Sequence, residues 1–201
     1  MDEKIFMSSI AHQTLPKDSG EKRKFSTGAQ RDDNVTVLKG RMDLLPHNEV
    51  ALCYRRAKVM PPIEEGLEVA QFYDCIDAFM KDKNVEHLAD AICIVHASLD
   101  EYKNLPMEYM FLDVSLLYQT GAIKYKENNW KNGMPVKVYI DCGCRHYHKA
   151  RVANYAKRNG MDCEYFDEPH YRGPVWNLLC AMWTSTNLPE MLEDLVVIEK
   201  A

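Results

Sequence analysis

The stretch Ile63–Val95 decides the fold, and it reads "IEEGLEVAQFYDCIDAFMKDKNVEHLADAICIV". Apolar residues recur in it at steps of three and four, the period of a helix with one buried face. The first series is Val69, Phe72, Ile76 and Phe79, and the second is Leu88, Ala91 or Ile92, Val95 and Leu99. Because the polar segment "KDKN" between the two series is short, the pattern predicts two antiparallel helices.

Each predicted helix carries a group of acids. The segment "EEGLE" holds Glu64, Glu65 and Glu68, and "EHLAD" holds Glu86 and Asp90. Helical spacing places the first group in line with the apolar series that follows it, so these carboxylates extend the core-facing side of the helix. We expect the antiparallel hairpin to bring the two groups opposite each other.

Carboxylates gathered in a partly dry site repel one another unless a cation neutralises them. Oxygen ligands without thiolates suit hard divalent ions, so the five acids predict a site for Mg²⁺ or Mn²⁺, about two ions as in two-metal phosphoryl-transfer enzymes. The alternative is that the acids are solvated residues at helix starts, where negative charge is favourable in any case.

The rest of the chain also has helical patterns, and no segment has a clear strand pattern. Residues 1–34 are polar and rich in turn formers, which predicts an arm laid over the core. We expect a single all-α domain over 35–201, with the acid-bearing hairpin at 48–103 and a nucleotide-binding helical region at 105–187. Within that region, helices are predicted at about 108–125, at 136–158 and through "VWNLLCAMW".

Composition narrows the class of protein. The 201 residues carry a formal net charge of −5, which offers no general attraction for nucleic acid or an anionic membrane. No apolar run approaches membrane-spanning length, and the first residues lack the pattern of a signal peptide. The seven cysteines are scattered, which favours reduced thiols and a cytoplasmic location.

The spacing of the acids resembles the Glu-Glu-x-x-Glu and Glu-x-x-Asp signature of the MazG-like nucleoside triphosphate pyrophosphohydrolases. That resemblance implies an all-α bundle with extra flanking helices and a long N-terminal loop segment. It also implies a homo-oligomer, since members of the group complete their site by pairing subunits. His87 stands where the family usually has a second Glu, which leaves the role of that position open, and Gly66 is unfavourable within a helix.

Four other segments resemble the phage dATP/dGTP diphosphohydrolases of the MazZ type. They are "KFSTGAQRDDN…KGRMDLLP", "YQTGAIKYKENNWKNGMPV", "YIDCGCRHYHKA" and "EPHYRGPVWNLL". Gly173 departs from the pattern, which usually has a His at that place. The resemblance implies hydrolysis of a purine deoxynucleotide in the host cytoplasm.

The same segments contain residues suited to a nucleotide. Lys124 and Arg145 can balance phosphate charge, and the aromatic rings of Tyr125 and Trp130 can stack on a base. His146 and His170 are candidates for phosphate contact or for a structural role, and Asn129 and Asn177 offer amides that can recognise a base edge. Each of these residues could equally be a surface charge, a loop anchor or a buried structural group.

The run "DCGCRHYHK" suggests a zinc site, but its geometry argues against one. Alternate side chains on a strand stand too far apart to share one ion, and on a helix they point to different faces.

The sequence therefore predicts metal-dependent hydrolysis of dGTP or dATP to the monophosphate and pyrophosphate. The metal would lower the pKa of a water, a carboxylate such as Glu64 would accept its proton, and Lys124 and Arg145 would balance the leaving pyrophosphate. The alternatives are a broad-specificity housekeeping pyrophosphohydrolase, a metal- and nucleotide-binding module without turnover, and a purely structural helical protein.

Overall fold

The computed structural model describes residues 22–24, 26–27, 30–32 and 40–193. The chain divides into two units, residues 1–39 and residues 40–201. The predicted arm at 1–34 lies mostly outside the described residues. In the first unit, β1 (Lys22–Lys24) pairs antiparallel with β2 (Gln30–Asp32), with Lys22 opposite Asp32. The sequence did not predict this short hairpin, because its charged strands lack the apolar alternation that indicates a sheet.

The described part of the second unit is helical, which confirms the all-α fold class. Short 3₁₀ turns connect or flank several of the α-helices. The α-helices are α2 (His47–Arg56), α3 (Glu68–Asp82), α4 (Val85–Ser98), α5 (Met107–Tyr125), α6 (Val136–Arg158) and α7 (Gly173–Asn187). The 3₁₀ turns are η1 (Met42–Leu44), η2 (Asn129–Asn132), η3 (Glu164–Phe166), η4 (His170–Arg172) and η5 (Pro189–Leu192).

The predicted hairpin is formed by α3 and α4. Lys83 adopts a left-handed conformation with φ of 60° directly after α3, and this reverses the chain. The side chain of Asn84 then accepts a hydrogen bond from the backbone N–H of Glu86, capping the first turn of α4. Apart from the half-buried Val69, the apolar series named above is buried on both helices, with Phe72 and Leu88 fully inaccessible to solvent. Burial of these two faces holds the hairpin together.

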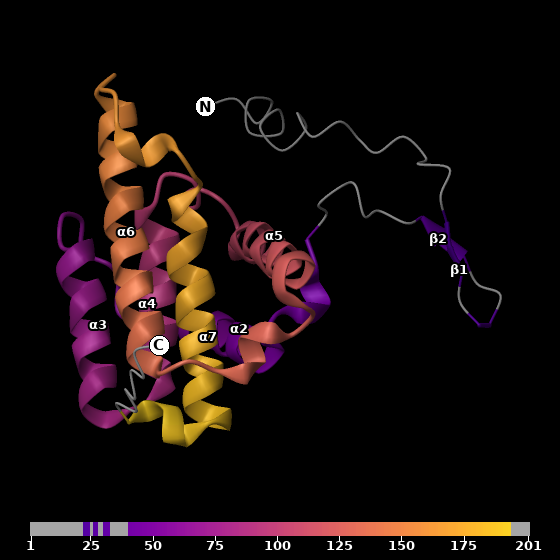
Figure 1. The fold of residues 1–201 in the computed structure, drawn as a ribbon. Helices are drawn as coiled ribbons and strands as arrows, with labels where there is room; N and C mark the ends of the chain where they lie inside the picture. The colour runs from indigo at the N-terminus through magenta and orange to yellow at the C-terminus, as the bar shows by residue number, and fades with distance from the viewer. Residues whose placement is uncertain (1–21, 25, 28–29, 33–39, 194–201) are drawn as a thin grey trace, which may run out of the picture. The chain divides into compact units, whose positions relative to one another are not determined.

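Helices α3, α4, α6 and α7 lie alongside one another in a bundle, while α5 runs obliquely beside α7 (Figure 1). Most residues of α4 are buried, as expected for a helix with neighbours on several sides. Phe72 of α3 stacks on Tyr147 of α6 with ring centroids 4.3 Å apart, which joins the hairpin to the second half of the chain. The Tyr147 hydroxyl lies 2.9 Å from that of Ser98 at the end of α4.

The prediction of helix from Asn48 through the acid segment is wrong between α2 and α3. Residues 57–67 are turns and extended chain, and they contain Pro61 and Pro62, which end helices. Gly66, placed in the first predicted helix, instead has φ of +85° in a turn, a conformation that glycine adopts without strain. Helix α3 therefore begins only at Glu68.

Candidate functional site

The two acid groups do not face each other in this structure, which corrects the geometry expected of the hairpin. In an antiparallel pair, the start of the first helix lies beside the end of the second. Glu68 is the first residue of α3, and its carboxylate is 3.7 Å from Arg151 of α6. Asp90 lies eight residues before Ser98, the last residue of α4, so about 12 Å of helix axis separates it from the level of Glu68.

The charge of Asp90 acts on two nearby thiols, which agrees with its level along the hairpin. The pKa of Cys75, near the middle of α3, is raised to about 11, first by burial and then by the negative charge of Asp90. Burial and the same carboxylate raise the pKa of Cys93 to about 12. Asp90 therefore faces the middle of α3.

Arg56, at the end of α2, neutralises the second acid group. Its Nε and Nη2 atoms each donate a hydrogen bond of 2.8 Å to a different oxygen of Asp90, and its Nη1 donates one of 3.1 Å to Glu86. The Asp90 side chain is only 12% exposed, whereas that of Glu86 is 48% exposed. A fork of this kind is a strong form of Arg–carboxylate pairing. The cation beside these two acids is thus a guanidinium of the same chain.

Glu64 and Glu65 are exposed residues of the segment before α3. His87 occupies the position where the resembling family usually has a second Glu. Its Nε2 atom lies 3.0 Å from Oδ2 of Asp82. Among the residues that the structure describes, no group of three potential ligands includes any of the five predicted acids. The arrangement therefore does not fit a single five-acid metal site.

Four candidate nucleotide residues lie together at the end of α5 and in η2. The Lys124 ammonium lies 4.8 Å from the centre of the exposed Tyr125 ring. Asn129 is exposed in η2, where its side-chain oxygen accepts a hydrogen bond from Asn132. The Trp130 ring packs edge-on against Tyr118 and Trp183, with centroids 5.4 and 5.1 Å apart. Trp130 thus anchors this turn to the helical core, while Lys124, Tyr125 and Asn129 face outward.

The other four candidates lie on α6, η4 and α7. Arg145 is exposed on α6 and pairs with Asp141 one turn earlier. Asn177 is buried and donates its amide N–H to the carbonyl of Gly173, so its side chain is used within α7. His146 and His170 meet directly, with their Nδ1 atoms 3.0 Å apart.

Two carboxylates that the sequence reasoning missed complete this histidine pair. Glu168 Oε1 lies 3.0 Å from His170 Nδ1, and Asp167 Oδ1 lies 3.1 Å from His170 Nε2. The pKa of His146 is lowered, mainly by burial and then by the charge of His170. The short segment Asp167–His170 was a signal for this site, because it holds three polar groups just before a buried helix.

The side chains of "DCGCRHYHK" point to different neighbours around α6. His146 faces His170, whereas the ring nitrogen of His148 lies 2.7 Å from the hydroxyl of Tyr73 on α3. Cys142 contacts Arg145 on the outer surface of α6. All seven cysteines are free thiols.

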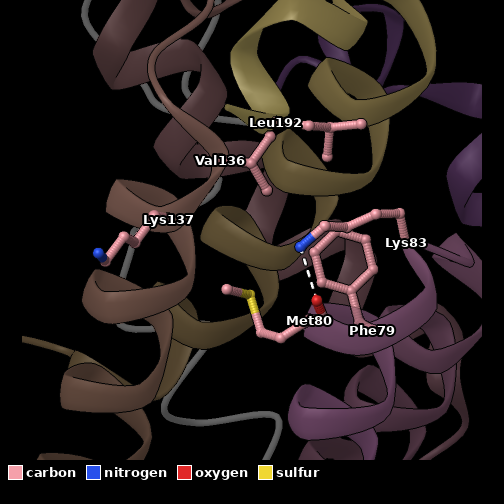
Figure 2. Close-up of a pocket in the computed structure, with 6 residues that line it drawn as sticks. All are labelled: Phe79, Met80, Lys83, Val136, Lys137 and Leu192. Carbon is pink, nitrogen blue, oxygen red and sulfur yellow. Dashed lines mark hydrogen bonds between the residues drawn. The ribbon is translucent and has the colours of Figure 1, made fainter. Parts of the chain in front are cut away.

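The described part of the chain includes two hollows with defined linings. Figure 2 shows the smaller, of about 140 Å³, where Phe79 and Val136 form the apolar lining and the Lys83 ammonium donates to the carbonyl of Met80. Its volume is below the usual range for ligand sites. The larger hollow, of about 330 Å³, lies beside the end of α6 and is lined by Tyr165, Glu168 and His170 among others. Its volume lies at the lower end of the usual range for ligand sites, and it borders the histidine pair.

Comparison with known families supports one of the two resemblances. Residues 101–194 match the family model described as the N-terminal part of the dATP/dGTP diphosphohydrolases. This segment is therefore similar to the dATP/dGTP diphosphohydrolases. No curated protein and no solved structure matched the chain.

The matched segment begins after α4 and spans α5, α6 and α7. It contains all eight residues predicted for the nucleotide and the pair formed by His146 and His170. It contains none of the five predicted metal-binding acids. None of the described helices is both long and apolar enough to cross a bilayer.

Proposed function

We propose that this protein hydrolyses dATP or dGTP to the monophosphate and pyrophosphate in a metal-dependent reaction. The observation that carries the proposal is the match of residues 101–194 to the diphosphohydrolase domain. That domain includes the cationic residues Lys124 and Arg145 and the exposed ring of Tyr125. In our proposal the two cations bind phosphate oxygens and Tyr125 stacks on the purine.

Glu86 and Asp90 remain the best placed of the predicted acids for a divalent ion, because they are one helical turn apart and share Arg56. A metal–nucleotide complex would replace the guanidinium as their cation, and Arg56 would then be free to bind phosphate. We assign Glu64, Glu65 and Glu68 no role in this pair, since Glu64 and Glu65 lie before α3 and Glu68 lies beside Arg151. We also propose that the protein acts in the cytoplasm as a homo-oligomer.

The second candidate function is nucleotide binding without turnover. The separation of the two acid groups favours it, because phosphoryl hydrolysis by the two-metal route requires carboxylates that converge on the ions.

One experiment separates these two functions. Each dNTP and NTP is incubated with the full chain and Mg²⁺ or Mn²⁺, and pyrophosphate and nucleoside monophosphate are measured. We expect metal-dependent release of dAMP or dGMP, with the activity reduced in both Arg145→Ala and Glu86→Ala. The matched control for Arg145→Ala is Arg158→Ala, which removes another exposed arginine of α6 that pairs with Asp100. Binding of a nucleotide with no product from any of them would contradict hydrolysis and identify a binding module.

A further inference from the structure

Three potential metal ligands converge where the loop after α6 returns to the bundle. His146 comes from the middle of α6, and Glu168 and His170 come from the segment that leads into α7. One ligand atom from each residue lies within 4.8 Å of the other two. In the described ranges this is the only such group of three residues. Segments more than twenty residues apart in sequence therefore supply one small polar cluster.

The hydrogen-bonding roles within the cluster favour a proton or a metal ion beside His170 Nδ1. His170 Nε2 is 3.1 Å from the Asp167 carboxylate, which can only accept, so this nitrogen carries the N–H. In the neutral ring, His170 Nδ1 then presents a lone pair. It faces the Glu168 carboxylate at 3.0 Å and His146 Nδ1 at 3.0 Å. His146 Nδ1 can donate an N–H to this lone pair, but the Glu168 carboxylate can lie 3.0 Å from it favourably only with a proton or a metal ion between them.

The spacing matches metal coordination. Two nitrogens bound to one tetrahedral ion with bonds near 2.05 Å lie about 3.3 Å apart. The two Nδ1 atoms are 3.0 Å apart, so a shift of a few tenths of an ångström, on the order of the tolerance of such sites, would admit an ion between them. Asp167 then serves as the carboxylate that orients a ligating histidine from behind, a usual partner of such residues.

The surrounding structure holds the two imidazoles in place. The His170 side chain is only 1% exposed, and the Tyr165 ring packs edge-on against it at 5.9 Å. Gly173, at the start of α7, has no side chain, and a Cβ at that position would collide with the His146 ring. Gly173 stands where the resembling family usually has a His, and its lack of a side chain leaves the space that the His146 ring occupies.

We propose that His146, His170 and Glu168 bind a divalent transition-metal ion of the Zn²⁺ class. Two imidazole nitrogens favour Zn²⁺, Co²⁺, Ni²⁺ or Fe²⁺ over Mg²⁺, which prefers oxygen ligands and octahedral geometry. Three protein ligands leave a fourth position open, as in catalytic zinc sites rather than structural ones. Since Glu168 and His170 also line the 330 Å³ hollow, a water or a small anion can reach that position from it. This site is independent of the proposed nucleotide hydrolysis.

The test uses metal alone, without nucleotide. The full chain is stripped with a chelator, dialysed and titrated with Co²⁺ while visible absorption and melting temperature are followed. We expect one Co²⁺ per chain, ligand-field bands without a sulfur-to-cobalt charge-transfer band, and a higher melting temperature because the ion binds the folded state. A large excess of Mg²⁺ should leave the bands unchanged, whereas Zn²⁺ should remove them.

Glu168→Gln is the decisive variant, because the Glu168 side chain is 55% exposed and the substitution leaves the core untouched. We expect it to weaken Co²⁺ binding by about tenfold or more. Glu164→Gln, an exposed acid of the same segment, is the matched control and should bind as the wild type. His146→Ala tests the half-buried ligand, with circular dichroism to verify folding. Unchanged binding in Glu168→Gln, or a sulfur charge-transfer band, would overturn the proposal.

Discussion

The guanidinium group of Arg56 binds both carboxylate oxygens of Asp90, through Nε and Nη2 at 2.8 Å each. This pair joins the end of α2 to the second turn of α4. It also explains how the Asp90 carboxylate, whose side chain is 12% exposed, is tolerated beside the apolar face of α4. A carboxylate desolvated to this degree requires a cation or several donors.

Arg56→Ala should therefore destabilise the fold. Removing the guanidinium leaves Asp90 without its charged partner, and we expect the free energy of unfolding to fall by about 2 kcal/mol, the scale of hydrogen bonds to charged groups. Urea unfolding followed by circular dichroism measures this change. Arg55→Ala is the matched control, because Arg55 is the exposed neighbour on the same helix, and its effect should stay within about 0.5 kcal/mol.

The same variant tests whether Glu86 and Asp90 bind a divalent ion. With Arg56 absent, Mg²⁺ or Mn²⁺ should raise the melting temperature of Arg56→Ala more than that of the wild type, since no guanidinium competes for the carboxylates. Equal effects of the ions on both proteins would remove the two acids from the proposed metal site. Equal stabilities of Arg56→Ala and Arg55→Ala in metal-free buffer would show that the Asp90 pair contributes little.

Gly173→Ala should disturb the histidine pair without adding or removing a charge. Because the new methyl group would collide with the His146 ring, either the ring or the start of α7 must move. We expect a loss of about 1–3 kcal/mol in unfolding free energy, the usual cost of overpacking, and weaker Co²⁺ binding. Differential scanning calorimetry and the cobalt titration measure the two effects.

Gly121→Ala provides the comparison for this substitution. Gly121 lies within α5, and a Cβ there would meet nothing within 4 Å beyond its chain neighbours and the nearby backbone of its own helix. Alanine at that position should stabilise the protein by about 0.5–1 kcal/mol through helix propensity and leave Co²⁺ binding unchanged. If Gly173→Ala behaved in the same way, the close approach of His146 to α7 would not be a constraint on the site.

Helix boundaries were predictable where the chain marks them locally. The prediction of a helix at 136–158 matches α6, which starts directly after Pro135, and the prediction at 108–125 matches α5 to within one residue. The helical prediction failed at Glu64 and Glu65. Spacing of three and four residues places side chains on one face only where the backbone is helical, and the backbone is not helical at these two residues. Pro61, Pro62 and Gly66 favour an extended segment instead.

The candidate site was harder to predict, because it depends on which segments meet. Helical spacing gives the side of a helix on which an acid lies but not its level relative to the neighbouring helix. The separation of Glu68 from Asp90 follows only from where α3 and α4 begin and end in the antiparallel pair. His146 and His170 were both candidates, yet their contact depends on how residues 159–169 return to α6. Glu168 was missed because an exposed acid in a loop resembles any solvated charge.

His96 provides a pH-dependent test of the packing around α4. Its ring is half-buried with Nε2 2.9 Å from the carbonyl oxygen of Leu105, and burial lowers its pKa from the ordinary 6.5, an effect partly opposed by that hydrogen bond and by the charge of Glu108. Above the ordinary value His96 is neutral in both the folded and the unfolded chain. As the pH falls through 6.5, His96 binds a proton in the unfolded chain before it does so in the folded chain, so the folded state loses stability.

His96→Gln should reduce this loss, because Gln does not titrate and its amide N–H can still donate to the carbonyl of Leu105. We expect the unfolding free energy of the wild type to fall more than that of the variant between about pH 7.5 and 5.5, a window in which histidines but few carboxyl groups titrate. Urea unfolding in chelator-treated buffer at each pH measures the difference. His47→Gln is the control, since the His47 ring also meets a carbonyl, that of Met42 at 3.0 Å, but on the exposed surface. A wild type and a His96→Gln variant with parallel pH profiles would mean that His96 takes up a proton as easily in the fold as in the unfolded chain.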